Sequence, residues 1–505
     1  MPNTGWRETG NAREKGQSKE NLKIKTTMVN QEKKQPHAVF IPYPLQSHIK
    51  CMLKLARVLH HKGIRITFVN TQSNHKRLLN SSGSHDLNDV PDFQFKTIPD
   101  GLDNAEQTQT TSEITSYLAK NLFGSLVDLV GGLESPATCI VADGILSFAK
   151  TLLAAEKLKV PIILNWIFAA CGFMGFYQAK VLMEKGIVPL KDESYLTNGH
   201  LDTLVDIPGM KGIRLRDLPE HVLGVKPTTI ESLNFLVQMA NDADKVQHMI
   251  IHTFDELESS LINELRSKFP RIYTVGPLEL LVNQIVDQKE NKNFISYSLR
   301  KEEPTCFKWL ESKEPNSVVY VNFGSLAVMS LETLVEFGWG LVNSNHYFLW
   351  VIRSDLVDGG SGSIVLPLEL VEAIKGKGFI SNWCSQEEVL NHSSVGGFLT
   401  HGGWGSVIES LSAGVPMLCW PVSSDQKTNC RQMCTEWEVA MEIERNVKRN
   451  EVEKLLKELM EGAKGEKLRN KANEWMKKAR IAIATNGSSF LNIEKLVNEI
   501  HVFSK

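Results

Sequence analysis

The chain has 505 residues, of which 42% are hydrophobic and 23% are charged, and its 56 Lys and Arg against 58 Asp and Glu give a net charge of −2. This composition argues against disorder, because the apolar mass is large enough to offset the entropy of ordering. It also argues against a general nucleic-acid-binding protein, whose phosphate contacts need a basic excess. At about 100–200 residues per domain, the length predicts two or three domains.

The first 35 residues are polar and carry side chains of both charges, without the apolar core of a secretory signal peptide. We interpret residues 1–35 as a disordered N-terminal extension and expect a cytoplasmic protein. The longest apolar stretch, residues 161–177, contains a proline and an asparagine. A membrane span needs about 20 apolar residues, so we predict no span and interpret this stretch as a strand that runs into a buried helix. The eight cysteines are scattered along the chain, which favours buried thiols over a disulfide framework or a metal site.

Short runs of β-branched residues alternate with longer helical patterns between residues 36 and 275. The predicted strands are 38–41, 64–69, 139–142, 162–164, 250–252 and 272–275, and the predicted helices include 47–62, 113–130 and 147–157. This alternation implies βαβ units and a parallel sheet, which makes residues 36–275 one α/β domain. Residues 276–303 start with Gly276-Pro277 and then become polar and mixed in charge, a composition typical of an interdomain linker.

The alternation restarts after the linker. The predicted strands are 318–323, 347–352, 395–399 and 417–420, and the predicted helices are 331–343, 406–413 and 426–437, with a charged helical end from about residue 450. The fold class is therefore α/β, with two similar doubly wound halves. Ligands of open α/β sheets lie beyond the carboxyl ends of the strands, so two such halves that face each other would leave a cleft for a ligand.

The usual phosphate-binding and nucleophile motifs of α/β proteins are absent. No Gly-x-Gly-x-x-Gly dinucleotide fingerprint follows a strand, and neither a P-loop nor a Gly-x-Ser-x-Gly elbow occurs. The missing fingerprint counts against a nucleotide-sugar epimerase or dehydrogenase, which remains an alternative that NAD(P) titration would test. If this chain binds a phosphate group, a turn of a different kind must hold it.

That turn is predicted after the strand that ends at Thr400. His401 is followed by Gly402, Gly403, Trp404, Gly405 and Ser406, which open a helix. Glycines let a ligand come close to the backbone, and the free N–H groups at a helix start attract anions, so this turn suits a diphosphate. By itself a glycine-rich turn of this kind is a weak signal, and a purely structural role is the alternative.

Polar and aromatic residues on either side of the turn strengthen this interpretation. Trp383 offers a flat face for a base, while Gln386 and Glu409 can bind ribose hydroxyls. Asp425 and Gln426 stand side by side between a strand and a helix, where they can bind sugar hydroxyls. Buried polar groups at a strand end need hydrogen-bond partners, and a ligand would supply them.

The segment from Trp383 to Gln426 resembles the signature box of plant UDP-dependent glycosyltransferases of family 1. The resemblance covers the chain from about Pro36 to its end and is strongest to the family-85 group, whose members glucosylate terpenoids, cyanohydrins and similar aglycones. Stretches such as SYLTNGHLDT and SAGVPMLCWP are most similar to the steviol 13-O-glucosyltransferases of that group.

This resemblance implies a GT-B fold, with an acceptor domain at 36–275, a UDP-sugar domain at 304–480 and a C-terminal helix within 481–505 that packs back on the first domain. It implies a monomer without a metal or cofactor, with UDP-glucose as the donor substrate. The implied donor-binding residues are Trp383 and the Cys384 backbone for uracil; Gln386 and Glu409 for ribose; Ser325, His401, Trp404, Gly405 and Ser406 for the diphosphate; and Asp425 and Gln426 for glucose.

The base of the family follows the first strand, and here that residue is His48, with Asp143 as the acid after a later strand. Imidazole titrates near neutral pH, which suits a general base, and a carboxylate partner orients the ring and stabilises its charged form. The implied reaction is a single inverting displacement, in which an acceptor hydroxyl attacks the anomeric carbon of UDP-α-glucose and a β-glucoside forms. The hydrogen-bond donors at the helix start, around residues 403–406, would stabilise the charge on the departing diphosphate.

The acceptor side is expected near Leu45, Ile145, Leu146 and Phe148, for which plain core packing is the alternative. Their apolar character favours a small lipophilic acceptor, such as a diterpenoid of the steviol type, with a cyanohydrin, iridoid or flavonoid as alternatives. Several residues depart from the family pattern: Gly405 replaces an Asn, Ile167 stands where Thr is frequent, Ser424 precedes Asp425, and the 206–208 turn is one residue short. Ile167 and the 206–208 turn keep open a second hypothesis, a sugar-nucleotide-binding relative with lost or weak turnover.

Overall fold

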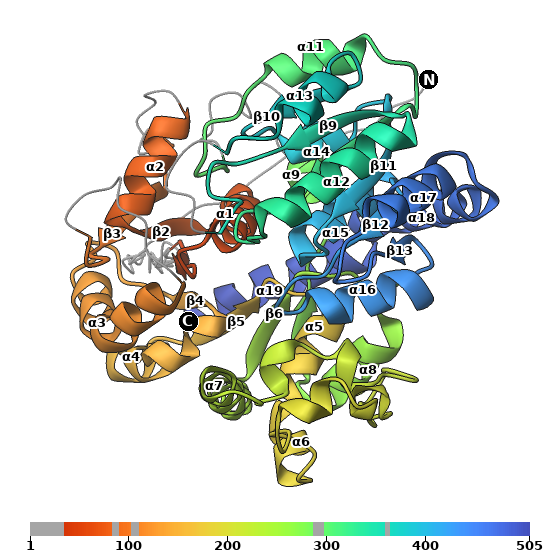
Figure 1. The fold of residues 1–505 in the computed structure, drawn as a ribbon. Coiled ribbons are helices and arrows are strands. Elements are labelled where there is room, and N and C mark those ends of the chain that lie inside the picture. Colours follow the sequence, from red (N-terminus) through yellow and green to blue (C-terminus); the bar gives the residue numbers. More distant parts are fainter. Residues whose placement is uncertain (1–34, 83–89, 103–110, 286–296, 359–363) are drawn as a thin grey trace, which may run out of the picture. The chain divides into compact units, whose positions relative to one another are not determined.

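The structure is a computed structural model that describes residues 35–82, 90–102, 111–285, 297–358 and 364–505. The predicted N-terminal extension lies outside these residues except for Gln35. Two parallel sheets with helices packed against them form the described part of the chain (Figure 1), which confirms the predicted α/β class.

Seven described strands form the first sheet in the order β3-β2-β1-β4-β5-β6-β7, and every neighbouring pair is parallel. Their bounds are β1 His37–Ile41, β2 Arg65–Thr71, β3 Phe93–Ile98, β4 Cys139–Asp143, β5 Ile162–Trp166, β6 His248–Ile251 and β7 Arg271–Thr274. The central strands β1 and β4 are buried on both faces and are rich in Val, Ile and Ala, as expected for a parallel sheet covered on both sides.

Six described strands form the second sheet in the order β10-β9-β8-β11-β12-β13, again all parallel. Their bounds are β8 Val318–Asn322, β9 Tyr347–Val351, β10 Gly378–Ser381, β11 Val395–Thr400, β12 Met417–Cys419 and β13 Ala440–Glu442. The sequence did not predict β3, β10 or β13. All three lie at the edges of their sheets, where one side of a strand is less buried and the apolar signal is weaker.

Each sheet reverses its strand order at one point, between β1 and β4 in the first sheet and between β8 and β11 in the second. The crossover connections leave a crevice at such a point, beyond the carboxyl ends of the two strands. The chain continues from β1 toward His48, and β4 ends at Asp143. In the second sheet β8 leads to Ser325 and β11 leads directly to His401. Both predicted halves of the site therefore follow switch-point strands.

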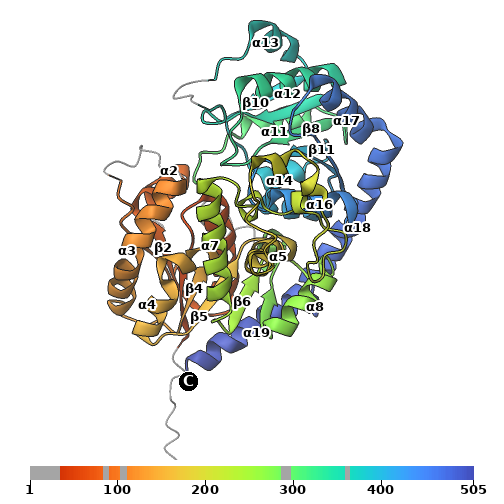
Figure 2. The same cartoon turned by 60° about the horizontal axis from the view of Figure 1, so that its bottom comes forward.

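The helices cover the faces of both sheets (Figures 1 and 2). They are α1 Gln46–His61, α2 Gln72–Ser82, α3 Thr111–Gly131, α4 Thr151–Leu158, α5 Ala170–Tyr177, α6 Ala179–Glu184, α7 Pro227–Ala243, α8 Ser259–Lys268, α9 Leu278–Ile285, α11 Thr305–Glu311, α12 Leu331–Ser344, α13 Leu368–Ile374, α14 Gln386–Leu390, α15 Trp404–Ala413, α16 Gln426–Thr435, α17 Arg449–Glu461, α18 Ala463–Ile483 and α19 Ser488–Phe503. None of the described helices is both long and apolar enough to cross a membrane.

One predicted helix, 147–157, is interrupted. Residues Gly144–Ala149 form a 3₁₀ turn, and α4 begins only at Thr151. Lys150 between them adopts a φ of +62°, which ends the first turn and redirects the chain. The predicted strand that runs into a buried helix at 161–177 is confirmed as β5 followed by α5.

The cores follow the alternation of side chains along the strands. In β1, Val39 and Ile41 face one core, while Ala38 and Phe40 face another. The core that contains Val39 extends without a break to Tyr320 of the second sheet. A continuous apolar core therefore links the two sheets.

Helices α9 and α19 both pack against the first sheet and its helices, although α9 lies in the segment predicted as a linker. Leu278 and Leu281 of α9 are buried in the same core as helix α1. In α19, Ser489 Oγ donates a 2.5 Å hydrogen bond to the Gly276 carbonyl, and Asn492 Nδ2 donates one of 2.7 Å to Thr274 Oγ1. The end of the chain thereby contacts β7 of the first sheet.

Replacing Leu496 of α19 by Ala should lower the free energy of unfolding by about 2–5 kcal/mol, because this fully buried side chain would leave a cavity. Leu491 on the same helix is 41% exposed, and its replacement by Ala provides the matched control. Urea denaturation of both variants measures the difference. Equal losses would contradict the docking of α19.

Candidate active site

A cleft of about 980 Å³ opens where the carboxyl ends of the two sheets meet. Its walls include the start of α1 and the β5–α5 connection from the first half. The second half contributes the loops after β8 and β10, the turn after β11, and the loop before α16. The volume lies at the upper end of the range usual for small-molecule sites.

His48 stands in the first turn of α1 and is held by Asp143 at the end of β4. Its Nδ1 lies 2.6 Å from Asp143 Oδ2, and the two residues are 6% and 1% exposed. Asp143 is itself fixed, because its oxygens accept the backbone N–H groups of Ile145 at 3.1 Å and Tyr43 at 3.3 Å. With Nδ1 bound to the carboxylate, Nε2 is the nitrogen that remains to accept a proton from a ligand.

Apolar side chains border His48 in the cleft. The ring of Phe168 meets the imidazole edge to face at a centroid distance of 6.2 Å. Phe168 and its neighbour Ile167, which follow β5, both line the cleft and are 7% exposed. The wall of the cleft beside the histidine is therefore apolar, which suits an apolar molecule with one polar group.

The turn after β11 is built around His401. Gly324 has a φ of +73°, and a Cβ there would approach the imidazole to 2.5 Å; a Cβ on Gly403 would do the same. Only glycine at both places lets the two loops close on the ring. Burial, followed by the nearby Arg353, lowers the pKa of His401 to about 4, so the ring is neutral near pH 7. Its Nδ1 is buried with no hydrogen-bond partner among the described residues.

Helix α15 starts at Trp404, two residues earlier than predicted. Gly403 caps it with extended backbone, so the first N–H groups of the helix have no partner within the helix. Nothing lies within 4 Å of the position of a Cβ on Gly405, and this residue lines the cleft. The helix start is thus open to a ligand and carries the positive end of the helix dipole.

Gln386 and Glu409 are hydrogen-bonded to each other on the wall of the cleft. Gln386 Nε2 donates to Glu409 Oε2 at 2.8 Å and to Ser406 Oγ at 3.1 Å. The oxygen of the same amide accepts a 2.9 Å bond from Asn322 Nδ2. The orientation of the amide is therefore fixed at both ends.

Trp383 and Asp425 occupy two separate regions of the cleft lining. The indole Nε1 of Trp383 donates to Ser298 Oγ at 3.1 Å, and the guanidinium of Arg300 lies 5.5 Å from the ring centroid. Asp425 is 4% exposed, and its carboxylate accepts a 2.8 Å bond from Asn429. Burial raises the pKa of Asp425 to about 6, although the Asn429 bond opposes this shift.

The structure brings the predicted catalytic and donor-binding residues together at one cleft. The cleft is lined by His48, Ser325, Trp383, Cys384, Gln386, His401, Trp404, Gly405, Ser406, Glu409, Asp425 and Gln426, with Asp143 directly behind His48. The four predicted acceptor residues are not part of this lining. Leu45 and Ile145 pack partly buried against the core, Leu146 is 1% exposed within it, and Phe148 lines a separate cavity of about 740 Å³.

The charged residues of the cleft that sequence analysis missed include Lys50, Lys54, Glu279 and Glu387. The sequence offered one signal for these residues. Lys54 lies in the apolar run of α1, at a position where a buried side chain is expected, and a buried charge needs a partner. Glu387 was overlooked beside Gln386, and Glu279 because its segment was predicted as a linker.

Comparison with known proteins agrees with this geometry. Residues 44–470 match the family described as UDP-glucoronosyl and UDP-glucosyl transferase. The chain belongs to this family. It is 62% identical to UDP-glycosyltransferase 85C1 of Stevia rebaudiana, and 56% identical to UDP-glycosyltransferase 85C2 of the same plant, over 95% of this chain and 99% of each relative. The chain is thus a UDP-glycosyltransferase of the plant family-85 group, and members of this group transfer glucose to small plant metabolites.

Solved structures share the fold at lower identity. Os79 from O. sativa, in complex with UDP, superposes with a TM-score of 0.75 at 24% identity over 92% of this chain and all of that chain. TcCGT1, also in complex with UDP, gives 0.77 at 23% identity over 93% of this chain and all of that chain. These likenesses confirm the GT-B arrangement of two Rossmann-like domains.

Replacing Glu279 by Gln should remove part of the pH dependence of stability. Burial raises the pKa of Glu279 to about 7, with Lys54 opposing this shift and Glu387 and Glu409 adding to it. A carboxyl group whose pKa is raised by folding stabilises the protein fully below its unfolded pKa, and this contribution is lost as the pH rises through 7. The Gln variant keeps an acceptor for the 2.8 Å bond from Ser412 but has no charge to bury.

We expect the variant to stay within about 1 kcal/mol of the wild type at pH 5 and to exceed its unfolding free energy at pH 8 by up to about 3 kcal/mol. Urea denaturation between pH 5 and pH 8 measures this difference. The exposed Glu332, replaced by Gln, is the control and should give no such trend. If the unfolding free energies of Glu279→Gln and the wild type change with pH in the same way, the raised pKa of Glu279 is wrong.

Proposed function

We propose that this enzyme transfers glucose from UDP-glucose to a hydroxyl group of a small lipophilic plant metabolite, with inversion at the anomeric carbon. His48 acts as the general base and Asp143 holds and stabilises its imidazole. The observation that supports this most directly is the 2.6 Å contact between these two residues at one wall of the cleft. The opposite wall carries the open start of α15.

In this proposal the second half holds the donor. Trp383 stacks on uracil and the Cys384 backbone bonds its edge, while Gln386 and Glu409 bind the ribose. The diphosphate lies at the start of α15, where the amides of Trp404 and Gly405, with Ser325, Ser406 and His401, surround it. The unpartnered Nδ1 of the neutral His401 supports this placement, because such a nitrogen can donate to an anion without burying a charge.

Asp425 and Gln426 bind the glucose hydroxyls. The Gln426 oxygen already accepts the backbone N–H groups of Val422 at 2.8 Å and Ser423 at 3.0 Å, so its Nε2 donors are left for a ligand. In the reaction, His48 removes the proton of the acceptor hydroxyl as its oxygen attacks the anomeric carbon. The bond to UDP breaks, and the helix start stabilises the charge that develops on the leaving diphosphate.

The acceptor is proposed to lie against Ile167 and Phe168 beside His48. A diterpenoid of the steviol type is favoured by the resemblance to steviol glucosyltransferases. Relatives named for other acceptors are more distant: 7-deoxyloganetin glucosyltransferase of Gardenia jasminoides is 50% identical over 91% of this chain and 97% of its own, and (R)-mandelonitrile beta-glucosyltransferase of Prunus dulcis is 45% identical over 93% and 98%.

An acceptor panel tests this proposal. The enzyme is incubated with UDP-glucose and steviol, 7-deoxyloganetin, mandelonitrile or a flavonoid alcohol, and product mass and anomeric configuration are determined. We expect a β-glucoside, with the highest kcat/KM for the diterpenoid. An α-glucoside would contradict the single displacement, and UDP binding without transfer to any acceptor would favour a binding protein without turnover.

Replacing His48 by Ala should reduce kcat by about 10²–10⁴-fold, the usual contribution of a general base. The dissociation constant of UDP should change by less than about twofold, since no part of the proposed nucleotide contact involves this ring. Steady-state kinetics and calorimetric titration with UDP measure the two quantities. Transfer at the wild-type rate would show that another group is the base.

A further inference from the structure

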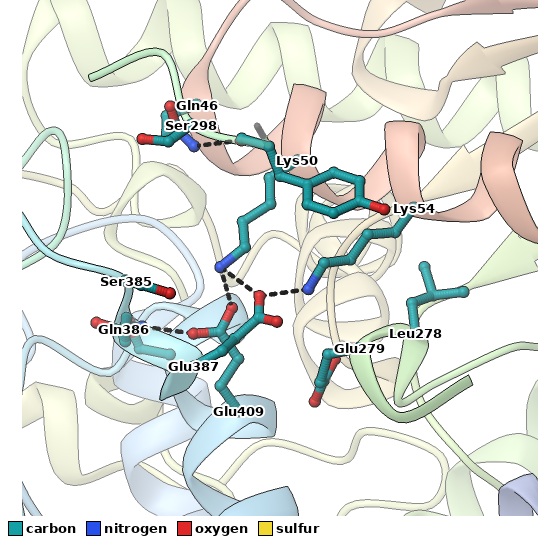
Figure 3. Close-up of polar contacts among 12 residues, drawn as sticks. Gln46, Lys50, Lys54, Leu278, Glu279, Ser298, Ser385, Gln386, Glu387 and Glu409 are labelled. Atoms are coloured by element: carbon teal, nitrogen blue, oxygen red, sulfur yellow. Dashed lines mark hydrogen bonds and ion pairs between the residues drawn. The ribbon is translucent and has the colours of Figure 1, made fainter. Parts of the chain in front are cut away.

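An ion-pair cluster spans the cleft between α1 and the helices α14 and α15 (Figure 3). Lys50 Nζ lies 2.7 Å from Glu409 Oε1 and 2.6 Å from Glu387 Oε1, so one ammonium group bridges two carboxylates. Lys54, one helical turn further on, pairs with Glu387. The cluster contains two positive and two negative groups and is neutral when all four are ionised.

Glu409 is held from two sides before any ligand binds. Lys50 binds its Oε1, and Gln386 binds its Oε2 at 2.8 Å. The carboxylate is only 6% exposed and lines the cleft. Since each carboxylate oxygen has two acceptor sites, one site on each oxygen remains for a ligand hydroxyl.

The two carboxylates would repel each other without the lysine between them. Two acids that share one partly buried site do not both ionise readily, because the second charge raises the free energy of the first. Burial alone would raise the pKa of Glu387, but the ammonium groups of Lys50 and Lys54 hold it well below its usual range. Lys50 is the member of the pair that contacts both carboxylates, and it thereby holds them side by side on the wall of the cleft.

We propose that Lys50 is a positioning residue for the donor: through its contact with Oε1 it holds the Glu409 carboxylate in the orientation that accepts the hydroxyls of the ribose. This inference rests on the proposed function, in which Glu409 binds the ribose. A hydrogen bond weakens steeply when its acceptor leaves the favourable distance and angle, so the loss of the lysine, which leaves the carboxylate free to move, weakens the ribose contact itself.

Lys54 provides a matched control on the same helix. It is 4% exposed and pairs with Glu387, and its Nζ lies 5.6 Å from the ring centroid of Tyr297, but no hydrogen bond or ion pair joins it to Glu409. Removal of Lys54 therefore disturbs the same cluster, at a more buried position, without changing a direct partner of Glu409.

The test compares UDP with 2′,3′-dideoxy-UDP, which lacks both ribose hydroxyls. Dissociation constants are measured by calorimetric titration for the wild type, Lys50→Met, Lys50→Arg and Lys54→Met. We expect Lys50→Met to weaken UDP binding by about tenfold or more and to change binding of the dideoxy nucleotide by less than about twofold. The preference for UDP should thus collapse in this variant, persist in Lys54→Met and be largely restored in Lys50→Arg.

Kinetics give a second readout. Lys50→Met should raise the KM for UDP-glucose while kcat stays within a few-fold of the wild type, because His48 and Asp143 are unchanged. If the Met variant does not fold, Lys50→Gln, which keeps a polar side chain without the charge, should show the same loss of preference.

Three outcomes would overturn the inference. The preference for UDP over the dideoxy nucleotide could survive in Lys50→Met, or it could be lost to the same extent in Lys54→Met. UDP could also bind more tightly to Lys50→Met than to the wild type, which would mean that Lys50 competes with the ribose for Glu409. A wild type that binds UDP no better than the dideoxy nucleotide would refute the ribose contact of Glu409 as well. A wild type that fails to bind UDP at all would count against the proposed function.

Discussion

Charged groups that leave water need partners, and in this protein the partners lie on opposite walls of the cleft. Lys50 and Lys54 of α1 belong to the first half, whereas Glu387 and Glu409 belong to the second. An unpaired charge in such a place costs far more free energy than a paired one, so separating the walls would carry a large penalty unless water or a ligand replaced each contact. The apolar core that runs between the sheets adds a second constraint. Together they set the position of α1 relative to α14 and α15.

Helix α1 links the two proposed chemical tasks because of this constraint. Its first turn carries His48, and Lys50 follows two residues later. The first is tied to Asp143 of the same half, and the second to Glu409 of the other half. A shift of α1 that moved His48 would therefore also pull on the carboxylate that is proposed to bind the ribose. The proposed proton removal and the proposed donor binding thus both depend on the position of this one helix.

Much of this arrangement was predictable from the sequence. Buried parallel strands are apolar on both faces, so β1, β4, β8 and β11 were visible as short β-branched runs, and His48, Asp143 and His401 follow such runs. The edge strand β3 was missed because its sequence FQFKTI alternates between apolar and polar side chains and lacks such a run. The ion pairs were missed for a different reason. Lys50 and Glu409 are 359 residues apart, and nothing in either local sequence shows that the fold will bring them together.

The same reasoning explains why the sequence indicates the donor more clearly than the acceptor. The proposed donor site is built from side chains that bind one another directionally: Asn322 holds Gln386, which holds Glu409 and Ser406. Each hydrogen bond requires a particular residue type at a particular position, so the residues of the proposed donor site form a recognisable sequence motif. The wall beside His48 is formed by Ile167 and Phe168, whose apolar packing does not require one particular residue type. Apolar side chains of similar volume can replace one another at small cost, so the shape of the acceptor pocket can change while the donor site stays the same. Substitutions among apolar side chains beside His48 would then change the proposed acceptor without disturbing the proposed donor site.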